Sequence, residues 1–288
     1  MNSLFKLAAT AAILLAPVSI ANAEKIAGLT IDGKIVTFDS ATPMTIASSF
    51  SITGLAAGDQ LLGLDMRPAN SLLYSVSQTG RIYTLTTAGI ASLVSTLSTV
   101  PSGSSFGVDF NPMPDRLRII GSGGQNLRAN VATGATTTDT MITRAGGGAI
   151  ALMGTAYTNS VAGRAAPTST RIFGIDSVTD ALMTSDAPNG GVYRSVGSLG
   201  VGLTSSNMIG FDISGTSGLG YLSIDSAFYQ VNLRTGATRF IDTIGAGPLV
   251  GFTATSAVPE PATWGMMILG FGVVGIALRR RSSKLRLA

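Results

Sequence analysis

The feature that most constrains the fold is a strand pattern that recurs along the chain with a glycine at the same point in each copy. These glycines are 44, 47, 56 and 41 residues apart. They are Gly63, Gly107, Gly154, Gly210 and Gly251. Four-stranded units at roughly this period are typical of β-propellers. The repeat therefore predicts an all-β propeller, with a β-sandwich as the alternative that leaves the repeat unexplained.

Each copy begins with an apolar strand and continues with further short runs of β-branched and aromatic residues between turn residues. The opening strands are Leu61–Met66, Phe106–Phe110, Met208–Ile213 and, in a looser copy, Leu152–Tyr157. This composition predicts four short antiparallel strands per unit. The turn Thr-Gly-Ala-Thr also occurs twice, at 133–136 and 235–238, where the glycine fits the left-handed residue of a hairpin loop.

The two ends of the repeat region complement each other. Leu249–Thr253 is an opening strand with no unit after it, whereas the first unit (Ile26–Thr30, Lys34–Phe38 and Ile46–Ile52) lacks an opener. If the C-terminal strand completes the N-terminal blade, no sheet edge is left unpaired at the seam. We therefore expect a closed five-bladed propeller over residues 24–256.

The chain begins and ends with apolar segments of a different kind. Residues 1–23 carry Lys6, an apolar stretch and Ala-Asn-Ala, which predicts a signal peptide cleaved between Ala23 and Glu24. Trp264–Leu278 is an uncharged run of 15 residues followed by a basic tail at 279–288. Such a run is short for a membrane helix, which usually needs about 20 residues, but flanking arginines can snorkel. We expect one transmembrane helix with the basic tail in the cytoplasm.

The C-terminal segment, Ala257–Ala288, resembles the PEP-CTERM sorting tail of exported Gram-negative proteins. The resemblance rests on Pro259, Glu260 and Pro261 in the 257–263 linker, then the apolar run, then the basic cluster. It implies processing by an exosortase-type enzyme and a cell-surface or extracellular-matrix destination. Before processing, Trp264–Leu278 would hold the domain at the inner membrane on its periplasmic side.

The middle of the chain, about Lys25–Ala254, resembles an uncharacterised propeller-like domain family of unknown function. The residues that carry this resemblance are Phe38–Pro43 and Phe106–Pro112, the second followed by Asp115–Arg118 and Gln125–Arg128. The resemblance supports the fold and implies no activity.

Composition excludes several function classes. The chain has no histidine and no cysteine, which excludes Ser-His-Asp and Cys-His catalysis and the usual zinc sites. The net charge of +4 comes from the ends, because residues 24–263 hold 13 basic and 15 acidic residues. No basic stripe is left for nucleic acid. We assign no cofactor, and calcium is the one cation for which the sequence offers ligands.

Those ligands are Asp65, Asp109 and Asp212, each two residues after its glycine. Symmetry would gather them around the central channel, where three carboxylates could bind calcium or act as the acid and base of a glycoside hydrolase. The favoured interpretation is structural: an aspartate repeated in a propeller commonly accepts backbone N–H bonds between blades. The available cationic partners are Arg67, Arg118 and Arg128. We therefore assign no catalytic residue and no metal ligand.

The looser copy carries two insertions, Thr158–Pro167 and Ser185–Tyr193, and insertions on a rigid scaffold often bind ligands. Tyr157, Tyr193 and Tyr221 are the tyrosines left for a carbohydrate platform.

Our expectation is an exosortase-sorted surface or matrix protein whose propeller is a non-enzymatic binding or structural module, with exopolysaccharide as a candidate partner. The alternatives are a glycan-acting hydrolase that uses the channel carboxylates and a protein–protein scaffold.

Overall fold

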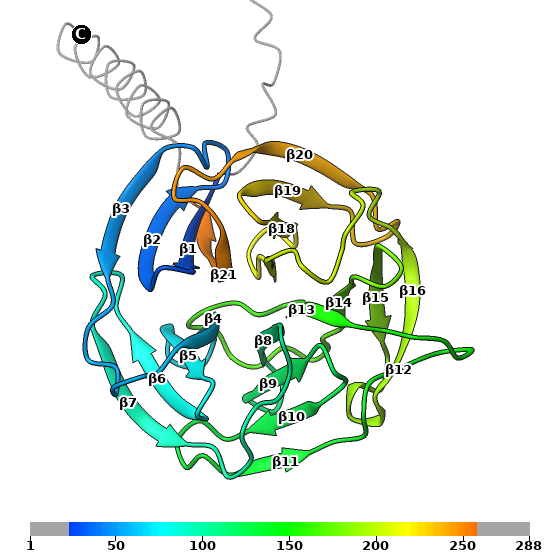
Figure 1. Cartoon of the computed structure of the whole chain (residues 1–288), viewed down its shortest axis with the longest axis horizontal. Coiled ribbons are helices and arrows are strands. Elements are labelled where there is room, and N and C mark those ends of the chain that lie inside the picture. Colours follow the sequence, from blue (N-terminus) through cyan, green and yellow to red (C-terminus); the bar gives the residue numbers. More distant parts are fainter. Residues whose placement is uncertain (1–22, 258–288) are drawn as a thin grey trace, which may run out of the picture.

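The computed structural model describes residues 23–257, which form five β-sheets arranged as blades around a central axis (Figure 1). The predicted propeller, its blade number and its all-β class are confirmed, and the β-sandwich alternative is wrong. The proposed signal peptide, the Pro259-Glu260-Pro261 motif, the membrane helix at 264–278 and the basic tail lie outside the described residues. Within residues 23–257, no helix is long and apolar enough to cross a membrane.

The blades follow one another along the chain, and the strands of each blade are named from the innermost to the outermost. Blade 1 contains β21 (Leu249–Ala257), β1 (Glu24–Thr30), β2 (Lys34–Asp39) and β3 (Ile46–Ser51). Blade 2 contains β4 (Leu61–Arg67), β5 (Leu72–Ser77), β6 (Arg81–Leu85) and β7 (Ala91–Thr96). Blade 3 contains β8 (Phe106–Asn111), β9 (Arg116–Gly121), β10 (Asn126–Ala129) and β11 (Thr136–Thr138).

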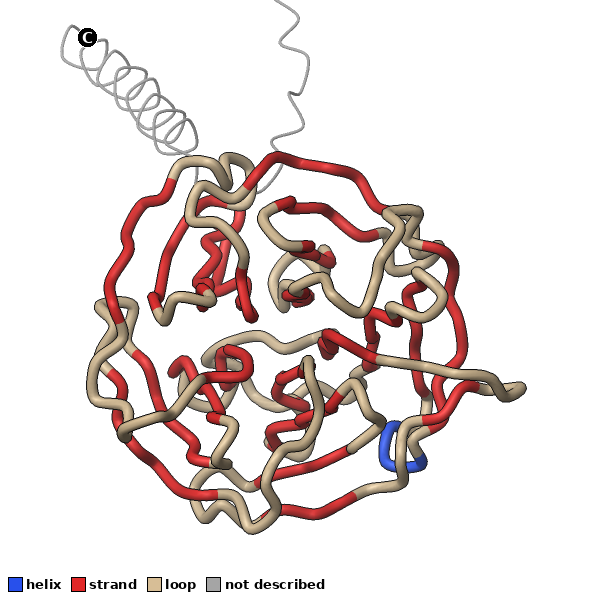
Figure 2. The backbone as a smooth tube through the Cα atoms, viewed as in Figure 1, coloured by secondary structure: helices blue, strands red, loops and turns tan. Residues whose placement is uncertain are grey.

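Blade 4 departs from the four-stranded pattern that the sequence predicts. It contains β13 (Leu152–Tyr157), β14 (Ile172–Asp176), β15 (Ala181–Ser185), β16 (Val192–Ser198) and, at its outer edge, β12 (Thr143–Arg144). β12 pairs in parallel with β16, because the chain arriving from blade 3 runs along that edge before it turns inward. A short 3-10 turn at Pro188–Gly190 precedes β16 and is the blue segment in Figure 2. Blade 5 is regular, with β17 (Ile209–Ile213), β18 (Gly220–Ile224), β19 (Ala227–Val231) and β20 (Thr238–Thr243).

The ring closes where the two ends of the described chain pair. β21 lies antiparallel to β1, with Glu24 opposite Ala257 and Thr30 opposite Leu249. Figure 1 shows the orange C-terminal strand beside the blue N-terminal strand. The predicted closure is therefore confirmed, and it satisfies the backbone groups of both terminal strands within one sheet.

The core lies between blades. Tyr74 of β5 and Phe110 of β8 meet edge to face with ring centroids 5.3 Å apart, so blades 2 and 3 share one apolar cluster. Phe228 of β19 likewise contacts Phe38 of β2 and Phe252 of β21, joining blade 5 to blade 1. Fully burying such a side chain contributes about 1.5–3 kcal/mol, so the interblade clusters hold the ring together.

The five repeated glycines let the inner strands approach one another closely. A Cβ on Gly107 would lie 2.4 Å from Oγ1 of Thr155 in the next blade, which is closer than atoms can pack. The same close contact recurs at every blade. Each repeat glycine faces the residue that comes directly after the repeat glycine of the next blade. The other four pairs are Gly63 with Val108, Gly154 with Phe211, Gly210 with Phe252, and Gly251 with Leu64. The repeat glycines thus set the narrow width of the channel.

Candidate functional site

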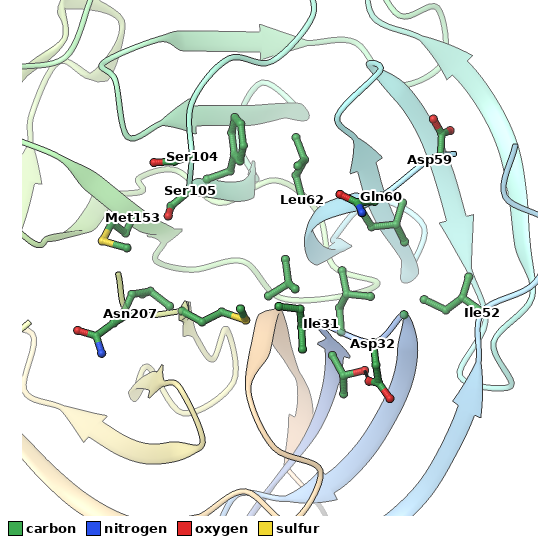
Figure 3. Close-up of a pocket in the computed structure, with 18 of the residues that line it drawn as sticks. Ile31, Asp32, Ile52, Asp59, Gln60, Leu62, Ser104, Ser105, Met153 and Asn207 are labelled. Carbon is green, nitrogen blue, oxygen red and sulfur yellow. Dashed lines mark hydrogen bonds between the residues drawn. The ribbon is translucent and has the colours of Figure 1, made fainter. Parts of the chain in front are cut away.

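A funnel of about 680 Å³ opens at one end of the channel. Its floor is apolar and comes from the starts of all five inner strands: Leu61 and Leu62, Phe106, Met153, Ile209 and Val250. Its rim comes from the turn between β1 and β2 and from the loops that precede the inner strands of blades 2, 3 and 5. Figure 3 shows Ser104 and Ser105 on one side of this opening and Gln60 on the other.

The rim is rich in small polar side chains. Those that line the cavity are Thr30, Asp32, Asp59, Gln60, Ser104, Ser105, Ser205, Ser206 and Asn207. A second cavity of about 330 Å³ shares Ser104, Ser105 and Ser205 and extends between blades 3 and 4 towards Ser122 and Ser177. The funnel therefore continues into a groove whose polar side chains are serines.

Asp59 organises one wall of the funnel and was not singled out by the sequence. Its carboxylate accepts hydrogen bonds from the hydroxyls of Thr79 and Tyr83 and pairs with Arg81 at 2.9 Å. Burial alone would raise its pKa, but these two hydroxyls and Arg81 outweigh burial and lower it. The Tyr83 hydroxyl also accepts the backbone N–H of Ala56 at 3.1 Å. Asp59 is thus ionised and fixes the loop in front of β4. The residues that bind it come together only in the folded chain, so no local sequence pattern reveals them.

Asp65, Asp109 and Asp212 lie deeper, where the channel narrows. All three are buried, and one carboxylate oxygen from each lies within 4.8 Å of the others. The three carboxyls therefore lie close together, and what they do there stays a prediction. The narrow part above them holds only about 10 Å³ of free space, as does the hollow beneath them.

Each of these aspartates also bridges to the next blade. The carboxylate accepts a backbone N–H from the residue three positions after the glycine of that blade. The donors are Phe110 to Asp65 at 2.7 Å, Tyr157 to Asp109 at 3.0 Å, and Ala254 to Asp212 at 2.6 Å. Asp65 and Asp212 use their second oxygen to accept the N–H of the following residue, Met66 or Ile213. The favoured structural interpretation of the repeated aspartate agrees with these bonds.

The surroundings of the three carboxyls favour their neutral forms. Burial raises the pKa of Asp65 well above its usual value, and the charge of Asp212 adds to this rise. Burial and the charges of Asp65 and Asp212 act in the same direction on the pKa of Asp109. Burial raises the pKa of Asp212 to about 6, although N–H bonds and the Thr253 hydroxyl oppose the rise. These carboxyls therefore need protons or a cation to be well accommodated near neutral pH.

The arginines named as candidate partners bind elsewhere, and that part of the sequence interpretation is wrong. Arg67 forms an ion pair with Asp115, and Arg118 and Arg128 both pair with Asp139. Arg118 is almost completely buried and also donates to Tyr157, Asn126 and Asn189. Within residues 23–257, no ion pair neutralises the channel aspartates. A divalent cation held by the three carboxylates would supply that neutralisation, since oxygen ligands suit calcium.

The two insertions of blade 4 contact neighbouring blades. In the first, Gly163 donates its N–H to the carbonyl of Pro68 in blade 2, and Ser160 lines the small hollow below Asp65. This insertion therefore covers the channel at the end opposite the funnel. In the second, Asn189 accepts a hydrogen bond from the buried Arg118 of blade 3. Both insertions have a packing role, and a binding role for them stays a prediction.

The tyrosines considered for a carbohydrate platform are not available for one. Tyr157, Tyr193 and Tyr221 are all buried, with at most 3% of their surface exposed. Tyr157 and Tyr193 pack in one apolar cluster, and Tyr221 packs in another. These three tyrosines are therefore closed to a ligand, and Phe106 is the aromatic side chain that lines the funnel.

Comparisons with known proteins recover both resemblances. A family model described as "Domain of unknown function (DUF4394)" matches residues 34–253, and one described as "PEP-CTERM protein-sorting motif" matches residues 257–281. The second motif implies export, an exosortase-type processing enzyme and an envelope or surface destination. A search of curated proteins found no match.

Solved structures resemble the chain only distantly. A protein of unknown function from Bacteroides caccae is 14% identical, with 76% of this chain and 72% of that chain covered and a TM-score of 0.35. The Dos1 propeller is 12% identical, with 78% and 62% covered and a TM-score of 0.39. YCF48 bound to D1 peptide is 11% identical, with 72% and 60% covered and a TM-score of 0.38. The chain thus spans about three fifths of the last two structures, and TM-scores this low carry no argument about function.

Proposed function

Because the chain belongs to the DUF4394 family and carries a PEP-CTERM protein-sorting motif, we propose that it is an exported surface propeller that binds an extracellular ligand in its funnel. The observation that carries this proposal is the funnel itself. All five inner strands of residues 23–257 contribute to this cavity of about 680 Å³. Pockets of this size are typical of small-molecule and oligomer-unit recognition.

The proposed route to the surface starts with a signal peptide at residues 1–23. Trp264–Leu278 then holds the chain in the inner membrane on the periplasmic side. An exosortase-type enzyme acts at Pro259-Glu260-Pro261, and the domain moves to the cell surface or the extracellular matrix. The proline pair suits recognition by such an enzyme because it keeps the peptide extended.

The direction of β21 supports a funnel that faces away from the proposed anchor. Val250, near the start of β21, lines the funnel, whereas Thr253–Thr255 line the hollow at the other end of the channel. β21 continues in that direction to Ala257, immediately before the sorting motif. A domain anchored through its C-terminal segment would therefore turn the funnel away from the membrane, towards external ligands.

The chemistry of the funnel favours a neutral, hydroxyl-rich ligand. Serine hydroxyls and the Gln60 amide can both donate and accept hydrogen bonds. The two rim carboxylates, Asp32 and Asp59, are already paired with Lys34 and Arg81. A repeating unit of an uncharged exopolysaccharide fits these groups, and its apolar ring faces can lie on the aliphatic floor.

The geometry does not favour the hydrolase alternative. The channel carboxyls lie behind the narrow part of the channel, which has about 10 Å³ of free space, so a sugar ring cannot reach them. Their oxygens lie within 4.8 Å of one another and are engaged by backbone N–H groups, which leaves no room for a glycosidic bond between them. The carboxylates instead join adjacent blades.

The test is binding of exopolysaccharide isolated from the culture medium of the native host. The protein is the full-length chain in detergent, and calorimetry or a pull-down on immobilised polysaccharide measures binding. Ser105→Trp places a large side chain in the funnel, while Thr87→Trp adds the same side chain at an exposed turn of blade 2. We expect the first variant to lose binding at least tenfold and the second to bind like the parent.

Equal binding by the two tryptophan variants would overturn the funnel as the site. Absence of binding by the parent would overturn the glycan ligand. Circular dichroism on both variants checks that they keep the parent's β-sheet content.

A further inference from the structure

Glu24 occupies a position that is unusual for an acidic side chain. It begins β1, between β2 and β21, and it is fully buried. One carboxylate oxygen accepts the hydroxyl of Ser214 at 2.9 Å, while the other has no hydrogen-bond partner among the described residues. A buried carboxylate oxygen without a partner is costly, so this site is electrostatically incomplete.

The backbone nitrogen of Glu24 already has one side-chain acceptor. Its N–H donates to Oγ of Ser40 at 2.9 Å, and that hydroxyl lies 3.5 Å from the Tyr221 hydroxyl. The negative charge of Glu24 also reaches its neighbours, because it adds to the raised pKa of Asp212 and of Tyr221, for both of which burial is the main cause. The site around this nitrogen is therefore negative and able to accept more than one hydrogen bond.

We propose that the site is a buried ammonium pocket, which the chain's own new N-terminus fills when the leader is removed between Ala23 and Glu24. Hydrolysis of that peptide bond adds one water, leaves a carboxylate on Ala23 and turns the single N–H of Glu24 into an ammonium group with three donors. One donor keeps the bond to Ser40. Another is directed at the unpartnered oxygen of Glu24 in the same residue.

Burial also fixes the order of events. Ala23 is 4% exposed and Glu24 is not exposed at all once β1 lies between its neighbours. A peptidase needs an accessible, extended substrate, so cleavage precedes the insertion of β1. β21 is the last strand to leave the translocation machinery, and closure of the ring follows processing. Removal of the leader then supplies the charge that stabilises the seam between β1 and β21.

The experiment compares two forms of the full chain from Glu24 to Ala288 in one detergent, so that the membrane segment contributes equally to both. One form has a free α-amine, and the other is Nα-acetylated, which keeps the N–H but removes the charge, as in the unprocessed peptide bond. At pH 7 a free α-amine is largely protonated, since its ordinary pKa is about 7.7–8.0. In urea unfolding, the unfolding equilibrium constant of the free-amine form should be smaller than that of the acetylated form, by a factor on the order of ten or more.

Glu24→Gln in both forms closes a double-mutant cycle. The stabilisation by the free amine should shrink strongly, because the neutral amide offers no charge to the ammonium group. Equal stability of the acetylated and free forms would overturn the proposal. So would a stabilisation that survives Glu24→Gln unchanged.

A second measurement does not depend on the variants folding. Isotopically labelled acetic anhydride reacts with accessible, unprotonated amines, and mass spectrometry of the N-terminal peptide reports the rate. We expect the α-amine of the folded chain to react at least tenfold more slowly than in urea, whereas an equal rate would overturn the pocket. The N-terminal mass of the protein from its native host tests the cleavage site separately: a first residue other than Glu24 removes the premise and leaves the funnel proposal intact.

Discussion

The funnel and the constriction below it are built from the same five inner strands, yet they differ in almost every physical property. In the constriction, which we define by the repeat glycines and the three channel aspartates, strands touch and carboxyls are buried. Directly before each repeat glycine on the same strands, the side chains diverge and about 680 Å³ opens. The repeated residues thus hold the blades together, whereas the variable loops in front of them supply the chemistry that a ligand meets.

The largest effect should come from filling the constriction. Gly107→Ala would bring a Cβ to 2.4 Å from Oγ1 and 2.6 Å from the backbone N of Thr155, and a backbone atom in blade 4 cannot move aside locally. We expect a loss of about 2–3 kcal/mol in the free energy of unfolding, measured with urea.

Gly123→Ala is the matched control. Gly123 has no left-handed backbone conformation, and a Cβ there would meet nothing within 4 Å. Its stability should change by no more than about 0.5 kcal/mol. If the two alanine variants were equally stable, close approach of the strands would not be the reason for the glycine.

The next effect separates two aspartates that the sequence treats as equivalent. Both oxygens of Asp65 accept backbone N–H groups, so Asp65→Asn must turn a donor towards Phe110 or Met66. Asp109 has one such bond, from Tyr157, and Asp109→Asn can keep it while losing a buried charge. We expect Asp65→Asn to be less stable than Asp109→Asn by about 1–3 kcal/mol in chemical unfolding at pH 7. The reverse order would mean that charge, not hydrogen bonding, governs this layer.

A third effect concerns pH. The folded-state pKa values of Asp65, Asp109 and Asp212 lie above the usual value of 3.8, so their contribution to stability is fully present below that pH and is lost as pH rises through the folded values. For Asp212 this loss begins near pH 3.8 and is complete a little above pH 6. We expect the unfolding free energy to fall as pH rises from about 4 through 6, and Asp109→Asn to reduce that fall.

Added calcium sharpens the pH measurement. If the three carboxylates bind the ion, millimolar calcium at pH 8 should restore the lost stability in the parent and not in Asp109→Asn. The metal hypothesis fails if calcium stabilises both proteins equally. It also fails if calcium has no effect on the parent.

The glycine period and the unmatched end strands were sufficient to predict the blade number and the closing pair of β21 and β1. The period predicts the blades because a side chain at each repeat glycine would collide with the next blade, as at Gly63, Gly107 and Gly210. The additional strand β12 escaped prediction, because two residues such as Thr143 and Arg144 carry no strand periodicity. Their pairing depends on the neighbouring β16 alone.

The candidate site could be predicted only where its residues recur at the same position in several blades. Asp65, Asp109 and Asp212 share a sequence position, so symmetry brought them together. The funnel wall has no such signal: Asp59 meets Arg81 and Tyr83 through a fold that places distant residues side by side. The partners of Arg67, Arg118 and Arg128 were mispredicted for the same reason. Asp139, for example, reaches Arg118 from the loop after β11.

The smallest effect should be confined to the funnel wall. Tyr83→Phe removes the hydroxyl that accepts the N–H of Ala56 and donates to Asp59, and it leaves the ring packed in place. We expect a loss of about 0.5–1.5 kcal/mol in unfolding free energy. Hydrogen exchange should speed up at Ala56 and stay unchanged at the Phe110 amide, which Asp65 holds in the constriction. Faster exchange at both amides would show that the wall and the constriction form one cooperative unit, and the contrast between them would then be one of shape alone.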